Sequence, residues 1–193
     1  MPPSEPPPWL SETAIATAGR LLAGHRLAFE RPLMAGVPWG RSPLQAAQEL
    51  FVAATVVLAH DGSADPRLIY ANRAALLLWR RPWSAMVGLP SRLTAEPAER
   101  QSRALVLELA RQQRALSGYA GTRVDSGGRR FRLENARLWT LRDDSGQPCG
   151  QAAAFASWWW LEPPHSGSPH PLAKRPNPVG GTEPGASVPP LQA

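Results

Sequence analysis

The last third of the chain narrows the choice of folds most, because it reads as three strands joined by two tight turns. Residues 119–125, 130–142 and 150–161 carry the apolar, aromatic and alternating patterns of strands. Ser-Gly-Gly at 126–128 and Asp-Asp-Ser-Gly at 143–146 separate them, and both sequences favour hairpin loops. The pattern therefore predicts a three-stranded antiparallel meander against which the rest of the chain must pack.

Two helices are expected ahead of the first strand. Ser11 is a good N-cap residue, and apolar residues recur at helical spacing up to Pro32, which predicts an amphipathic N-terminal helix. Residues 42–45 (Ser-Pro-Leu-Gln) combine a capping box with proline at the first helical position, so a second, shorter helix starts there. The apolar stripe of the first helix consists of Ile15, Ala18, Leu22 and Phe29.

Two strands and a third helix follow in close succession. Residues 55–60 (TVVLAH) are apolar and β-branched and stop at an Asp-Gly turn, and residues 68–71 read as a second strand. Asn72 is placed to cap a helix that ends near Trp79. Residues 83–88 (WSAMVG) lie between two prolines and predict one further helical turn.

The longest predicted helix runs from about Glu96 to Leu116 and is closed by Gly118. With about 100° of rotation per residue, its apolar and basic residues fall on opposite sides. The apolar arc consists of Ala98, Leu105, Leu109 and Leu116, and the basic arc of Arg100, Arg103, Arg111 and Arg114. We expect the apolar arc to pack on the sheet, and the basic arc to be a solvated face or a site for nucleic acid or an acidic protein.

This order of elements predicts an α+β fold: a five-stranded antiparallel sheet with helices packed on one face, preceded by the N-terminal amphipathic helix. It is also the order of a PAS domain. LIYANRAALLLW resembles the second strand and first helix of that family, with Asn72 at the usual asparagine. WSAMVGLP resembles the short helix that follows, and GRRFRLENARLWTLRDDSGQPCG resembles the last hairpin.

Four segments are more specific: YANRAALLLW, LPSRLTAEPAER, YAGTRVDSGGRRF and GQAAAF. Through them the chain resembles bacterial proteins built around a MEKHLA domain, a PAS-like module also found at the C-termini of plant class III homeodomain leucine-zipper factors. The resemblance covers residues 9–161. It implies a PAS-like fold and a sensing or partner-binding role, and it supplies no catalytic residues to carry over.

Both ends of the chain are expected to be disordered, over residues 1–8 and 162–193. Nine of the 22 prolines follow Glu162, and such a segment cannot bury enough apolar surface to fold. The sequence has no signal peptide, no stretch apolar enough for a membrane helix and a single cysteine, so we expect a cytoplasmic protein. The net charge is +6, and nearly all of the positive charge is carried by arginine. Such a charge attracts polyanions weakly but does not identify a particular partner.

A PAS-like fold leads us to expect a small-molecule pocket between the sheet and the helices. The residues expected near it are Tyr70, Trp79, Leu105, Tyr119, Phe131, Trp139 and Phe155; the alternative is that they only fill the core. Haem is disfavoured because His60 lies at a strand end and the long helix has no histidine. A cysteinyl-flavin adduct is disfavoured because Cys149 follows the last turn, and the sequence has no metal-ligand cluster.

The final strand carries three consecutive tryptophans, whose side chains must alternate between the two faces of the sheet. At least one indole must therefore point away from the face that the helices cover, and exposed apolar groups of this kind often mark an interface. The expected interface with a partner protein or a second copy combines Trp158, Trp159 and Trp160 with Ile15, Leu22 and Phe29.

Three functions remain to be compared. The first is a stand-alone PAS-like sensory or regulatory domain that acts through another protein, with or without a small ligand. The second is a module that binds nucleic acid or another polyanion through the arginine arc. The third is a small enzyme, which the sequence disfavours because it lacks a paired acid and base or an activated nucleophile.

Overall fold

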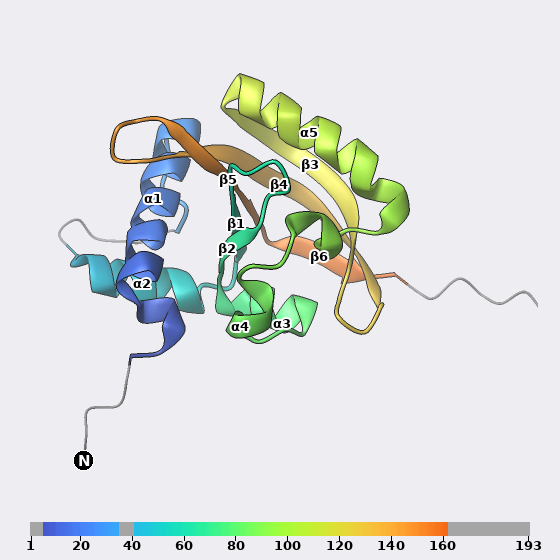
Figure 1. Cartoon of the computed structure of the whole chain (residues 1–193), viewed down its shortest axis with the longest axis horizontal. Coiled ribbons are helices and arrows are strands. Elements are labelled where there is room, and N and C mark those ends of the chain that lie inside the picture. The colour runs from blue at the N-terminus through green and yellow to red at the C-terminus, as the bar shows by residue number, and fades with distance from the viewer. Residues whose placement is uncertain (1–5, 35–40, 162–193) are drawn as a thin grey trace, which may run out of the picture. The chain divides into compact units, whose positions relative to one another are not determined.

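A computed structural model describes residues 6–34 and 41–161, except for the side chain of Arg111 (Figure 1). The terminal segments for which we expected disorder lie outside this range, apart from residues 6–8. The helices are η1 (Pro8–Leu10), α1 (Glu12–Phe29), α2 (Pro43–Val52), α3 (Arg73–Trp79), α4 (Trp83–Met86), η2 (Ser91–Thr94), η3 (Pro97–Glu99) and α5 (Arg100–Gln113). The strands are β1 (Val56–Asp61), β2 (Leu68–Ala71), β3 (Ala115–Val124), β4 (Arg130–Arg142), β5 (Pro148–Phe155) and β6 (Ser157–Trp160).

The strands form one antiparallel sheet in the order β2-β1-β5-β4-β3, which confirms the predicted fold class. The last predicted strand is divided at Ala156. β5 pairs with the C-terminal half of β4, and β6 pairs with residues 131–134 in its N-terminal half. β6 therefore continues the line of β5 beyond the point where β1 begins.

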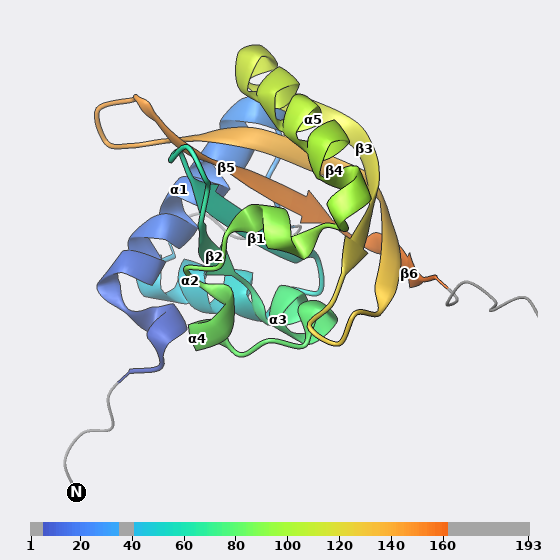
Figure 2. The ribbon, with the colours of Figure 1, turned by 45° about the vertical axis from the view of Figure 1, so that its right-hand side comes forward.

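Helices cover both faces of this sheet. One hydrophobic cluster joins α1 and α2 to a face that includes Val57 and Trp139. The other joins α3 and α4 to the opposite face, which includes Leu58 and Phe131. α5 crosses in front of β3 and β4 on this second side, while α1 passes behind the sheet (Figure 2). α1 and α2 thus cover the face that α3, α4 and α5 leave open.

A backbone irregularity in β4 decides which residues face which side. Asn135 has a positive φ of 52°, a conformation that Asn tolerates better than most residues. Phe131 and Leu133 before it share a cluster with Ala136 after it, so the two-residue alternation shifts by one position. This shift places Trp139 on the opposite face from Phe131.

The Asn72 side chain connects three elements at the start of α3. Its Oδ1 accepts hydrogen bonds from the backbone N–H of Val57 in β1 and of Ala75 in α3, at 3.0 and 3.1 Å. Its Nδ2 donates to the carbonyl oxygens of Ala53 and Thr55, at 3.1 and 2.7 Å, in the segment between α2 and β1. Asn72 is fully buried, so these bonds form without competition from water.

A buried histidine lies where α1 packs on the sheet. The His25 ring meets Trp139 edge-on, with 5.1 Å between centroids. Its Nδ1 lies 3.1 Å from the Arg31 carbonyl oxygen, so Nδ1–H donates there, and Nε2 then accepts from the Arg137 guanidinium at 2.6 Å. Burial, followed by the positive charge of Arg137, lowers the pKa of His25 to about 4, so the imidazole is neutral at pH 7.

We predict that Asn72→Asp destabilises the protein by about 3 kcal/mol or more, because it replaces a buried N–H donor with an oxygen that faces two carbonyl oxygens. Urea denaturation at pH 7 measures the loss. Asn135→Asp is the matched control, since Asn135 is exposed and aspartate also tolerates its positive φ. Equal losses in the two variants would contradict the role assigned to Asn72.

We also predict that the free energy of unfolding falls as the pH is lowered from 7 towards 5. The unfolded chain binds a proton at each histidine near pH 6.5, whereas folded His25 stays neutral until about pH 4, so acid favours the unfolded state. His60, whose pKa is also lowered, contributes in the same direction. Urea titrations across this range should give a flatter pH dependence for His25→Gln than for the wild type. An unchanged slope would show that folded His25 titrates normally.

Candidate functional site

A small cavity of about 50 Å³ lies between α5 and the sheet face that carries Leu58 and Leu133. Its floor comes from the central strands, and α5 and β3 close its other side. The lining residues are Leu58, Ala59, His60, Leu68, Trp79, Thr94, Arg103, Leu107, Tyr119, Arg123, Leu133, Ala136, Leu138, Gln151, Ala152, Ala153 and Phe155. The cavity therefore combines an apolar floor with a few polar groups, the composition typical of a ligand site.

Two arginines enter the lining from neighbouring elements. Arg123 of β3 is buried, and its guanidinium donates to the Thr122 carbonyl oxygen at 2.7 Å and to the Tyr119 hydroxyl at 2.8 Å. Arg103 of α5 has no hydrogen-bond or ion-pair partner among the residues that the structure describes. Burial, followed by repulsion from Arg123, lowers the pKa of Arg103 to about 10, so it still carries its charge at pH 7.

His60 and Gln151 lie side by side in β1 and β5 and form the polar end of the cavity. The Nδ1–H of His60 donates to the Asp61 carbonyl oxygen at 2.7 Å, which leaves Nε2 as a buried acceptor without a partner. Burial, together with the charge of Arg103, lowers the pKa of His60 and keeps the ring neutral. The Gln151 Nε2 donates to the Leu107 carbonyl oxygen at 2.8 Å and ties α5 to the sheet.

The structure brings together only part of the predicted pocket. Trp79, Tyr119 and Phe155 line the cavity, and Phe131 packs edge-on against Trp79 just outside it. The other three residues correct the prediction. Tyr70 and Trp139 lie in the α1–α2 cluster on the opposite face, and Leu105 is exposed on the outer side of α5.

The prediction for the long helix is wrong in its length and its facing. α5 starts only after the Pro97–Glu99 turn and stops at Gln113, so Leu116 belongs to β3. Leu105 and Leu109 are 69% and 42% exposed, whereas Ala110 is buried and Arg103 and Leu107 line the cavity. The side of α5 that faces the sheet therefore combines Leu107 and Ala110 with the charged Arg103, and two leucines are left on the outer side.

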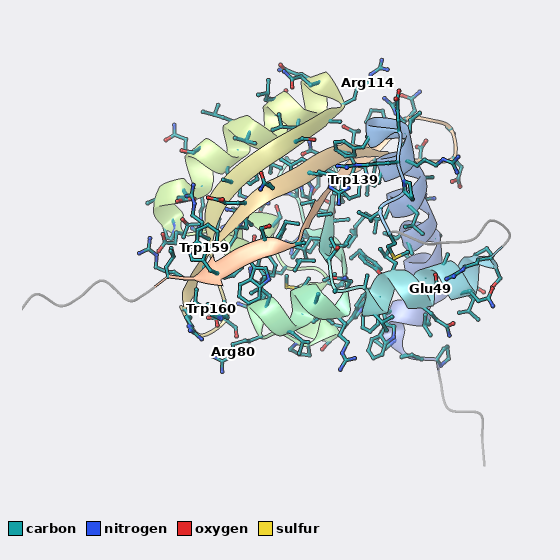
Figure 3. The ribbon with its side chains drawn as sticks, turned by 180° about the vertical axis from the view of Figure 1, so that it is seen from behind. Glu49, Arg80, Arg114, Trp139, Trp159 and Trp160 are labelled. Atoms are coloured by element: carbon teal, nitrogen blue, oxygen red, sulfur yellow. The ribbon has the colours of Figure 1, made fainter. Side chains whose placement is uncertain are left out.

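The arginines of the predicted basic arc do not form one surface. Arg103 lines the cavity, and the half-buried Arg100 donates to the Ala95 carbonyl oxygen at 3.4 Å. Arg114 is exposed beyond the end of α5 (Figure 3). The side chain of Arg111 lies outside the described part of the chain. This arrangement removes the continuous basic face on which the nucleic-acid interpretation rested.

The tryptophans of β6 alternate as predicted. Trp158 and Trp160 flank Phe131, with centroid distances of 6.1 and 5.6 Å, and the Arg129 guanidinium lies 4.0 Å from the Trp160 ring centroid. Trp159 lies between them in sequence and is 45% exposed (Figure 3). The predicted contribution of Ile15, Leu22 and Phe29 is corrected, because these half-buried side chains pack on the chain's own α1–α2 cluster.

Sequence reasoning missed the polar residues of the cavity. Arg123 lies on the same strand face as Tyr119, and His60 on the same face as Leu58. The two-residue period of strands could therefore have predicted that Arg123 and His60 point toward the helices. Gln151 carried no such signal, because its role depends on where α5 crosses the sheet. From sequence, His60 is expected to be an ordinary strand-end residue and not a haem ligand. The cavity that it lines has a volume of about 50 Å³, far below the roughly 300–1,000 Å³ of pockets for larger ligands.

The described residues contain no group of three or more His, Cys, Asp or Glu side chains arranged to hold a metal ion. Cys149 is half-buried at the start of β5, and burial raises the pKa of its thiol, which favours the unreactive protonated form. None of the helices in the described range has the length and apolar composition to cross a membrane.

Comparison with known proteins supports a PAS-type architecture. The family model of the MEKHLA domain matches residues 15–160. The PAS domain of a protein from Colwellia psychrerythraea is similar at 14% identity and a TM-score of 0.51, over 57% of this chain and 91% of that one. An RNA-binding Light-Oxygen-Voltage receptor is similar at 19% identity and a TM-score of 0.51, over 65% of this chain and 36% of the receptor. No curated protein matches the chain.

Proposed function

Since the chain belongs to the MEKHLA domain family, we propose that it is a sensory and regulatory domain in which a small molecule, held under α5, changes the surface presented to a partner protein. The observation that carries this proposal is the cavity. Its lining combines apolar side chains with the Arg103 guanidinium and the buried Nε2 of His60, and neither of these groups has a hydrogen-bond partner among the described residues. Buried polar groups without partners are costly in a core that serves only for packing.

α5 contributes residues both to the cavity and to the protein surface. Arg103 and Leu107 line the cavity, and Leu105 and Leu109 point away from it on the same helix. A ligand held by the Arg103 side chain would pull on α5, which the Gln151–Leu107 hydrogen bond anchors to β5. A small shift of α5 would then move two exposed leucines, which is the type of change that a partner protein can detect.

The partner surface in this proposal includes the exposed edge of β6. Trp159 exposes nearly half of its surface, and Trp158 beside it is 37% exposed. Large aromatic side chains of this kind supply much of the binding energy in protein interfaces. The polyanion alternative has less support, because the arginines on which it relied are dispersed. The enzyme alternative lacks a catalytic pair in the cavity, where two arginines face a neutral histidine.

Native mass spectrometry of protein purified from bacterial cells, before and after denaturation, tests the proposal. We predict a small-molecule adduct that is lost on unfolding, and its absence from Ala153→Leu, because Ala153 lines the cavity and leucine would fill it. Ala156→Leu is the matched control, since Ala156 is exposed on the same line of strands. The same spectra report the number of subunits. If the wild type is a dimer and Trp159→Ser is a monomer, the exposed edge of β6 forms the interface.

Two results would contradict the proposal. If the wild type shows the mass of the protein alone under every growth condition, it binds no ligand in the cell. If an adduct persists in Ala153→Leu, the ligand binds outside this cavity. Circular dichroism of both alanine variants shows whether a lost adduct reflects a filled cavity or an unfolded protein.

A further inference from the structure

The charges around the cavity are unbalanced. Arg103 and Arg123 both line it, and His60 is neutral, so the lining carries two positive charges. None of the residues that line it is an aspartate or a glutamate. Glu99 compensates part of the charge of Arg123 from outside, while its carboxylate accepts the Thr122 backbone N–H at 2.8 Å. No comparable carboxylate approaches Arg103 within the described range.

The two guanidiniums differ in how many of their donors are used. Arg123 is held by the Thr122 carbonyl oxygen and the Tyr119 hydroxyl, and its cation also lies 5.4 Å from the Tyr119 ring centroid. Arg103 makes no such bond to any residue that the structure describes, so its planar set of five N–H donors can serve a ligand in the cavity. Paired N–H donors on a guanidinium match the two oxygens of a carboxylate.

His60 adds a second polar requirement. Its Nδ1–H is used by the Asp61 carbonyl oxygen, so the buried Nε2 can only accept a hydrogen bond. A bare carboxylate has no proton to donate to it, but a hydroxyl group on the same molecule does. Leu58, Leu133 and Phe155 supply an apolar wall for the carbon atoms between the two groups.

From this arrangement we propose that the cavity binds a small hydroxycarboxylate, with its carboxylate on Arg103 and its hydroxyl donating to Nε2 of His60. This inference rests on the proposed function and specifies the ligand class of the same site. The lowered pKa of Arg103 agrees with it, because an anion would relieve the repulsion between the two guanidiniums.

The size of the cavity limits the ligand to a few heavy atoms. One water needs about 10–15 Å³ of such space, so a volume of about 50 Å³ suits a molecule the size of lactate rather than a sugar or a nucleotide. A more open cleft of about 420 Å³ adjoins the cavity and shares His60, Leu107 and Gln151 with it. The two residues joined by the Gln151–Leu107 hydrogen bond therefore line both the cavity and the more open cleft.

The test is an NMR titration of the full chain with three probes of similar size: lactate, propionate and lactamide, at constant ionic strength. We expect lactate to give saturable shifts of the Tyr119 and Gln151 backbone amides. Propionate, which lacks the hydroxyl, should bind about threefold or more weakly, and lactamide, which lacks the charge, roughly tenfold or more weakly. These comparisons change the ligand alone and do not depend on a variant that folds.

Arg103→Gln should weaken lactate binding by roughly tenfold or more. Arg114→Gln is the matched control, because it removes the same charge from an exposed position just beyond the same helix, and it should bind lactate like the wild type. If lactate and lactamide bind equally well, or if Arg103→Gln binds lactate as tightly as the wild type does, the proposed contact between a carboxylate and Arg103 is wrong. If lactate and propionate bind equally well, the proposed hydrogen bond from the hydroxyl to His60 is wrong. No saturable shift with any probe would overturn the ligand class, whereas the mass-spectrometric adduct would still decide the proposed function.

Discussion

The hydrogen bonds of the buried Asn72 amide hold the helical half of the domain on its sheet. One side chain accepts from β1 and α3 and donates to the segment that leaves α2. A primary amide offers two N–H donors and a carbonyl oxygen with two lone pairs, so one side chain can serve partners of both kinds. Because β1 and α3 are fixed relative to each other, Trp79 at the end of α3 reaches the cavity and Phe131 packs against its ring.

The second constraint is the way α5 meets the sheet. α5 turns Arg103 toward the cavity and leaves Leu105 and Leu109 exposed. Placing a charged group against the sheet has a cost that packing alone does not repay. A ligand-binding role accounts for this cost, since binding sites keep polar groups ready for a partner. The Gln151–Leu107 hydrogen bond ties α5 to β5 beside the cavity, where a bound ligand could change the position of the helix.

Much of the fold could be predicted because its signals are local. The Ser11 cap, the Ser42–Gln45 capping box and the Asn72 cap all form as expected. What failed depends on distant contacts. The φ of Asn135 shifts the face of Trp139, and α5 turns Arg103, Leu107 and Ala110 rather than Leu105 and Leu109 toward the sheet, which its own periodicity does not predict. The candidate site lies between α5 and β4, whose facing depends on these two effects, so residue types alone predicted only part of it.

A crystal structure of the protein purified from bacterial cells tests the central claim most directly, because that claim concerns what occupies the space beneath α5. The account predicts electron density for a small molecule in the cavity, in contact with the Arg103 guanidinium and Nε2 of His60. It would be contradicted by a cavity filled with the protein's own side chains, with Arg103 turned out to solvent and Leu105 or Leu109 turned in against the sheet.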